Sequence, residues 1–150
     1  MCSSDLQPPM RAGEWQALGD SWWPLAAFRE LDRALLHLRF NEPEIGLVIL
    51  RTEGDIDAVL SVDATLAENR EHWLIRETRL LMARVLRRLD LTAKSFFALI
   101  EPGSCFAGSL LELALAADRA YMLNDPARPT AIATSELNAG AFPKIGRAHV

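Results

Sequence analysis

The sequence is poor in several features, and each shortage excludes a class of protein. Its two cysteines, Cys2 and Cys105, are too few for a disulfide framework or a cysteine-based zinc site, and they suit a reducing compartment. With a formal net charge of -4, it lacks the basic excess that a general nucleic-acid binder needs. Its apolar runs are far shorter than the roughly 20 residues that cross a bilayer. Residues 1–10 lack the basic and then apolar pattern of a secretory signal. We therefore expect a cytoplasmic protein with no nucleic-acid or membrane partner.

Both ends of the chain resemble translated sequencing-adapter DNA, as CSSDL at residues 2–6 and IGRAHV at residues 145–150. We interpret residues 1–6 and 145–150 as foreign, exclude them from fold reasoning and expect no function of His149. Half of the chain is apolar, which is enough for a real core. Residues 7–143 are therefore predicted to be a partial α/β domain, cut at both sides.

Hydrophobic spacing predicts alternating helices and strands. Residues 7–20 show no clear period and are predicted to be a loop. A helix is expected over residues 24–40, because Pro24 suits a first helical turn and leucines follow at helical spacing. The apolar run GLVIL at residues 46–50 predicts a strand of a parallel sheet that is covered on both faces. The short apolar segment at residues 58–62 stays unassigned.

One long amphipathic helix is predicted over residues 66–90. Its buried side would carry Trp73, Leu74, Leu81, Val85 and Leu89. Arginines crowd its other sides, at positions 70, 76, 79, 84, 87 and 88. They either form a solvated face, balanced in part by neighbouring acids, or face the phosphates of an anionic cofactor tail. His72 has no metal-ligand partner at a useful spacing, so we expect it on the surface.

The stretch from Phe96 to Leu123 is the part of the chain with the clearest chemistry. It predicts a buried strand at residues 96–100, a loop with two glycines, a short helix that begins at Gly108 or Ser109, and a second strand. Within the helix, Glu112 is the lone carboxylate in an apolar run. A buried charge is expensive unless it is paired or has a chemical task.

Two interpretations of Glu112 stay open on local grounds. The unpaired N–H groups at a helix N-terminus can hold an anion or an oxygen on which negative charge develops. Glu112 leans back toward that terminus, so a carboxylate and an oxyanion site would share one space. Alternatively, Ser109 and Glu112 match the S-x-x-E capping box, in which Glu112 only bonds the backbone. Two other residues have equally ordinary interpretations. Cys105 would be a buried, inert thiol, and Glu136 would be a carboxylate in the first turn of a helix.

Three segments carry a resemblance to a known family. GSLLELA at residues 108–114, followed by AADRAY at residues 116–121, resembles the signature of the crotonase (enoyl-CoA hydratase/isomerase) superfamily. SELNAGAFP at residues 135–143 is similar to its second catalytic segment, with Ser135 where proline is usual. GLVILRTEGD at residues 46–55 resembles the strand and loop before its first oxyanion donor. The resemblance implies an α/β crotonase-like spiral fold of ββα units, here truncated at both ends.

The resemblance also implies roles for particular residues. Two backbone N–H groups would hold the thioester carbonyl of a CoA substrate, one from Ser109 and the other near Ser61. Glu112 and Glu136 fall on the positions that hydratases use as acid and base. Burial raises a carboxylate's pKa, and two nearby carboxylates split their pKa values, so that one group can donate a proton while the other accepts.

Ser104, Cys105 and Gly108 are expected to line the substrate pocket, and neither a metal nor a redox cofactor is implied. The loop EPGSCFAGS at residues 101–109 departs from the usual glycine-rich form of the superfamily. It resembles the branch that adds water to the epoxide or dihydrodiol of benzoyl-CoA and cleaves the ring, yielding a dehydroadipyl-CoA semialdehyde and formate. The expected partners are an acyl-CoA and further copies of the full-length chain. The alternatives are an ordinary enoyl-CoA hydratase or isomerase, and a non-catalytic CoA-binding or assembly module.

Overall fold

A computed structural model describes residues 13–142. Residues 1–12 and 143–150 lie outside this description, together with the ends interpreted as foreign, Cys2, Pro143 and His149. In chain order the described elements are α1 (Glu14–Leu18), η2 (Gly19–Ser21), α2 (Trp23–Phe40), β1 (Leu47–Leu50), α3 (Ile56–Glu68), α4 (Trp73–Asp90), β2 (Ser95–Ile100), α5 (Gly108–Ala116), β3 (Arg119–Met122) and η3 (Glu136–Asn138). The η elements are single 3₁₀ turns.

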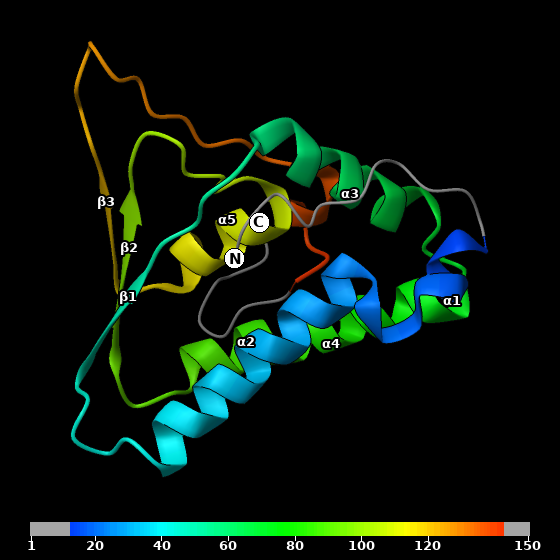
Figure 1. Ribbon diagram of the computed structural model, residues 1–150, viewed down its shortest axis with the longest axis horizontal. Coiled ribbons are helices and arrows are strands. Elements are labelled where there is room, and N and C mark those ends of the chain that lie inside the picture. The colour runs from blue at the N-terminus through cyan, green and yellow to red at the C-terminus, as the bar shows by residue number, and fades with distance from the viewer. Residues whose placement is uncertain (1–12, 143–150) are drawn as a thin grey trace.

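The described strands form one parallel sheet in the order β1-β2-β3. Val48 pairs with Phe96 in one ladder, and Ala98 pairs with Ala120 in the other. Parallel neighbours need a crossover connection, which α3 and α4 supply between β1 and β2, and α5 supplies between β2 and β3. Figure 1 shows these helices gathered on one side of the sheet. The predicted α/β class with a parallel sheet is confirmed.

Only one face of the sheet is covered by the described residues, so the expected two-sided cover of β1 is wrong for this part of the chain. Leu47 and Ile49 alternate outward on β1, and the Ile49 side chain is 52% exposed. Tyr121 of β3, whose ring contacts that of Phe97, is also exposed. The reason is that both crossovers pack their helices on the same side.

The helix predicted over residues 66–90 is two helices. α3 already begins at Ile56, which assigns the segment at residues 58–62, and it ends at Glu68 with Asn69 as its C-cap. α4 then begins at Trp73, with His72 as its N-cap, because the His72 Nδ1 accepts the Leu74 N–H at 3.3 Å. The break turns Trp73 outward, so this residue is 56% exposed rather than buried. The predicted buried side of this helix is therefore correct only from Leu74 onward.

The loop expected over residues 7–20 is helical where it is described. α1 buries Trp15, whose ring lies edge-on to the His72 ring with centroids 5.4 Å apart. His72 is therefore a capping residue with an aromatic partner rather than a plain surface histidine. α2 matches its prediction, with Pro24 in its first turn and Asn41 at its end.

The core lies between the helices and the inner face of the sheet. α2 packs along α4, and α5 packs against both α3 and α4. Phe28 of α2, Met82 and Val85 of α4 and Val59 of α3 are fully buried. Complete burial of a side chain of this size stabilises the fold by about 1.5–3 kcal/mol per side chain. α5 is thus held at the centre of the described structure.

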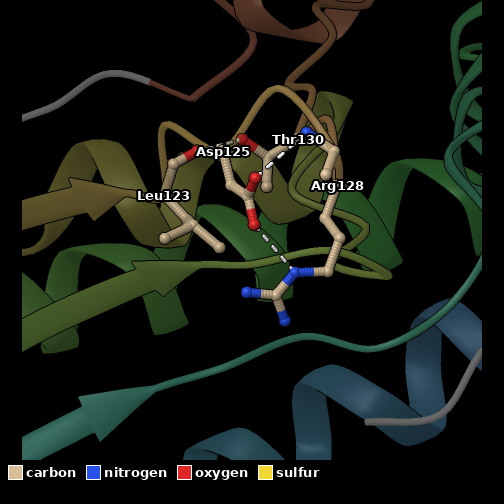
Figure 2. A network of polar contacts seen from close by, with 5 residues as sticks. Leu123, Asp125, Arg128 and Thr130 are labelled. Atoms are coloured by element: carbon tan, nitrogen blue, oxygen red, sulfur yellow. Dashed lines mark hydrogen bonds and ion pairs between the residues drawn. The ribbon is translucent and has the colours of Figure 1, made fainter.

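A polar turn returns the chain from β3 toward α5. Figure 2 shows Asp125 accepting from the Arg128 Nε at 2.9 Å, and Thr130 donating to the Leu123 carbonyl at 2.9 Å. Asp125 also accepts the Ala127 N–H, as aspartate does at the start of many turns. Beyond this turn, Ala133 pairs with Ala107, and its carbonyl accepts the Gly108 N–H at 2.9 Å. The segment after residue 130 is therefore fixed beside the start of α5.

Candidate active site

The N-terminus of α5 is buried and holds a carboxylate. The Ser109 N–H donates to Asp63 Oδ2 at 2.6 Å, and the Ser135 hydroxyl donates to the same oxygen at 2.7 Å. Asp63 lies on α3 and is fully buried. The positive end of a helix dipole favours a negative group at this place. Asp63 therefore joins three elements that are far apart in the sequence: α3, α5 and the segment that precedes η3.

Gly108 makes this close approach sterically permissible. Its φ of +45° lies in the left-handed region that favours glycine, and a Cβ at this position would stand 1.8 Å from Asp63 Oδ2. A β-carbon would collide with the carboxylate and with the Ser135 hydroxyl. Gly108 is thus required by the packing of Asp63 on the helix end; the expected role of Gly108 in lining a substrate pocket stays a prediction.

Burial raises the pKa of Asp63 above its ordinary value of 3.8. Removal from water disfavours the charged carboxylate, which is the largest effect. Hydrogen bonds from Ser109 and Ser135 act in the opposite direction, and the nearby charge of Glu112 raises the pKa further. The protonation of Asp63 therefore depends on its hydrogen bonds with Ser109 and Ser135 and on the charge of Glu112.

Glu112 is buried on α5, at 4% exposure, and is held by the tail. The Asn138 Nδ2 donates to Glu112 Oε1 at 2.6 Å and to the Gly108 carbonyl at 2.9 Å. The capping-box interpretation of Ser109 and Glu112 is wrong, because the N-cap is Ala107 and no side chain caps α5. A capping box forms instead between Ser135 and Asn138. The carboxylate of Glu112 is therefore a partner of the tail and not a cap of its own helix.

Glu136 lies on the same short turn as Asn138 and is exposed. The structure thus brings the segment of Glu136 against α5, where Asn138 rather than Glu136 contacts Glu112. Ser61 lies inside α3, where backbone N–H groups bond to carbonyls one turn earlier. Its own carbonyl accepts the Thr65 hydroxyl at 3.1 Å. The roles of Glu136 and Ser61 stay predictions.

Ser104 and Cys105 lie in the loop between β2 and α5. The Ser104 hydroxyl accepts the Glu101 N–H at 2.9 Å, and Ser104 lines a hollow of about 460 Å³ at the carboxyl ends of β1 and β2. Arg51 and Glu101 form an ion pair at the same hollow. Cys105 is buried, and its N–H donates to the Thr52 hydroxyl at 3.1 Å. Of the two predicted pocket residues in this loop, Ser104 lines the hollow and Cys105 does not.

Sequence reasoning missed Asp63 and Asn138. Asp63 carries the same signal as Glu112, a lone carboxylate among apolar residues, since Val59, Val62 and Leu66 share its buried face. Asn138 gives no comparable signal, because asparagine is common in turns. Among residues 13–142, no group of three or more His, Cys, Asp or Glu side chains is arranged to hold a metal ion. No helix in the same range is long and apolar enough to cross a membrane.

Comparison with known proteins gives one informative match, and no family model matches the chain. Over 134 residues the chain is 52% identical to benzoyl-CoA-dihydrodiol lyase from Aromatoleum evansii, a match that covers 89% of the chain. The chain is therefore similar to a segment of this lyase. It spans 24% of the length of this relative. The parallel sheet and the central α5 are consistent with a segment of a crotonase-like fold.

Proposed function

We propose that this chain belongs to the crotonase superfamily and carries part of the active site of a lyase that cleaves the oxidised ring of a benzoyl-CoA thioester. The proposed reaction consumes two water molecules with the epoxide, or one with the dihydrodiol, breaks a ring carbon–carbon bond, and yields a dehydroadipyl-CoA semialdehyde and formate. The name of the relative, at 52% identity, supports this substrate class. The observation that carries the proposal is the buried Glu112 on a helix whose N-terminus binds a carboxylate oxygen.

The Ser109 N–H is the proposed oxyanion donor. Its hydrogen bond to Asp63 supports this role, because the N–H already donates to a carboxyl oxygen in a buried place. The proposal requires the thioester oxygen to replace Asp63 Oδ2 at this N–H. Burial raises the pKa of Asp63 and so favours its neutral form, which is the weaker competitor for a hydrogen-bond donor. Displacement of Asp63 is therefore less costly than displacement of an ordinary ionised carboxylate.

Glu112 and Glu136 are the proposed acid and base. Glu112 is withdrawn from water and oriented by Asn138, which suits a group that acts directly on a bound substrate. Glu136 is exposed on the turn that carries Asn138, which suits a group that exchanges its proton with solvent. Positioned acids and bases contribute typically 10²–10⁴-fold to a rate.

The test replaces Glu112 with Gln. Glutamine keeps an oxygen that can accept from Asn138, so the fold should persist while proton transfer is lost. Because the chain spans a quarter of its relative, turnover is measured in the Aromatoleum evansii lyase with the matched segment replaced by this chain's residues. Glu68→Gln, an exposed position at the end of α3, is the matched control.

Product analysis separates the alternatives. Formate from an oxidised benzoyl-CoA supports the ring-cleaving reaction. Hydration of a crotonyl-type thioester without release of formate would instead support an ordinary enoyl-CoA hydratase. Binding of a CoA thioester without any product would favour the non-catalytic module. A Glu112→Gln variant that keeps its rate but loses stability would refute the acid–base role.

A further inference from the structure

One side chain of the tail, Asn138, reaches both halves of the candidate active site. It lies on η3, which packs against α5 and α3 and is the red turn beside α5 in Figure 1. Its Nδ2 donates to Glu112 Oε1 at 2.6 Å and to the Gly108 carbonyl at 2.9 Å. Its Oδ1 accepts the Ser135 N–H at 2.8 Å. Asn138 is therefore held at three points, and two of them lie on α5.

These contacts allow the amide group of Asn138 only one orientation. A carboxamide has two N–H donors on its nitrogen and only acceptor sites on its oxygen. The reverse orientation would place the oxygen against two acceptors, the Glu112 carboxylate and the Gly108 carbonyl, and the nitrogen against the Ser135 N–H. Both donors of Asn138 are consequently directed at α5.

The Gly108 carbonyl belongs to the same peptide group as the Ser109 N–H, which is the proposed oxyanion donor. In a planar trans peptide the C=O and N–H bonds point in opposite directions. Asn138 therefore bonds one side of this group, and the oxygen that the Ser109 N–H binds, here Asp63 Oδ2, lies on the other side. A hydrogen bond to the carbonyl fixes the plane of the peptide and polarises it, which strengthens its N–H as a donor.

The other donor of Asn138 holds the carboxyl group of Glu112. The Glu112 side chain has three torsions, and burial alone does not choose among their rotamers. The bond at 2.6 Å fixes the position of Oε1. Because one planar amide carries both donors, it also fixes the distance between this oxygen and the peptide that joins Gly108 to Ser109. The proposed acid and the proposed oxyanion donor are therefore held relative to each other by Asn138.

We infer that Asn138 is a positioning residue that sets the acid Glu112 and the oxyanion donor Ser109 N–H in one geometry. This inference rests on the proposed function, which gives these two groups their roles. Asn138 acts through them, because a carboxamide does not titrate and so cannot exchange the proton itself. A misplacement of about 1 Å at a reacting group can lower a rate by about 10²-fold. Loss of Asn138 should therefore lower kcat rather than weaken substrate binding.

The test compares two variants of Asn138 in the Aromatoleum evansii lyase that carries this chain's segment. Asn138→Asp keeps the shape of the side chain and an acceptor for the Ser135 N–H, but it loses both donors to α5. Asn138→Ala loses all three contacts and adds no second carboxyl beside Glu112. We expect kcat to fall roughly 10–100-fold in both variants, with KM changed by less than about 3-fold. Thr134→Ala, at an exposed position of the same segment, is the control and should change kcat by less than about 2-fold.

Two further readouts separate positioning from simple attachment of the tail. In NMR spectra of the 150-residue chain, Asn138→Asp should move the Ser109 amide proton upfield, because the peptide loses a polarising hydrogen bond. Urea unfolding of the same variant reports its stability separately. In the Glu112→Gln background, Asn138→Ala should lower the residual rate by a smaller factor than in the unchanged enzyme, since the contribution through the acid is already absent.

Several outcomes would overturn the inference. These are an unmoved Ser109 amide, a raised KM with unchanged kcat, a loss in Thr134→Ala as large as in the Asn138 variants, or an equal factor in the Glu112→Gln background. Failure of the proposed function gives a different pattern, in which no thioester is turned over although the Ser109 amide responds to Asn138→Asp. Turnover that neither Asn138 variant slows would retain the lyase and reject the positioning role.

Discussion

Replacing Asp63 with alanine removes the single oxygen on which two segments of the site converge. Asp63 Oδ2 accepts from the buried Ser109 N–H and from the half-buried Ser135 hydroxyl. Asp63→Ala leaves both donors without this acceptor, and at Ser109 it does so in a place that excludes water. The expected consequence is a loss of stability and a looser attachment of the tail to α5.

The magnitude follows from the two contacts. A hydrogen bond to a charged group contributes about 1.5–3 kcal/mol, so the two together contribute about 3–6 kcal/mol. Removal of a carboxyl that burial disfavours offsets part of this loss, since its pKa is raised in the folded state. We expect a net loss of about 2–4 kcal/mol, which lies in the range of other buried-network mutations.

Urea unfolding at pH 7, followed by the fluorescence of the buried tryptophans Trp15, Trp22 and Trp23, measures the free energy of unfolding. Glu68→Ala on the exposed end of the same helix is the control, with an expected change within about 0.5 kcal/mol. If Asp63→Ala changes the free energy of unfolding by no more than this control, Asp63 does not hold the two segments together.

Two further predictions concern the same helix terminus. Because the folded-state pKa of Asp63 is raised, the native state binds a proton more tightly than the unfolded chain. The part of the stability that comes from proton binding by Asp63 is therefore full below about pH 3.8 and is lost as the pH rises through the folded pKa, whereas the hydrogen bonds to Ser109 and Ser135 contribute separately. Urea unfolding across this pH range measures how the free energy of unfolding changes with pH. Asp63→Asn should remove the part of this pH dependence that Asp63 contributes, and an identical pH dependence in the variant would contradict the prediction. Gly108→Ala should cost about 3 kcal/mol or more, since its Cβ would meet Asp63 at a positive φ. Gly46→Ala, where no atom lies within 4 Å, should cost less than about 1 kcal/mol, and equal melting temperatures of the two variants would exclude the close contact.

Elements with a strong local pattern were predictable from the sequence. The apolar runs at residues 46–50 and 96–100 are β1 and β2, and the helix after the glycine loop begins at Gly108 as expected. The break between α3 and α4 was missed because residues 68–72, although polar, contain neither proline nor glycine as a signal for a helix end. It depends on the His72 cap and on the contact of its ring with Trp15, which is remote in sequence.

The candidate site was predictable only in part, for a similar reason. The importance of Glu112 follows from one carboxylate in an apolar helix, but its partner Asn138 lies 26 residues away. Asp63 lies 46 residues before Ser109, and only the folded chain brings the two together. The capping box failed because the local match between Ser109 and Glu112 was outweighed by these long-range contacts. The uncovered outer face of the sheet was likewise not predictable, because it depends on the side of the sheet on which the crossover helices pack.

The most direct test of the central claim is formate release from an oxidised benzoyl-CoA by the Aromatoleum evansii lyase that carries this chain's segment. The account predicts formate in step with substrate loss, and a rate lower by about 10²–10⁴-fold in Glu112→Gln at unchanged stability. Formate release by Glu112→Gln at the unchanged rate would contradict it.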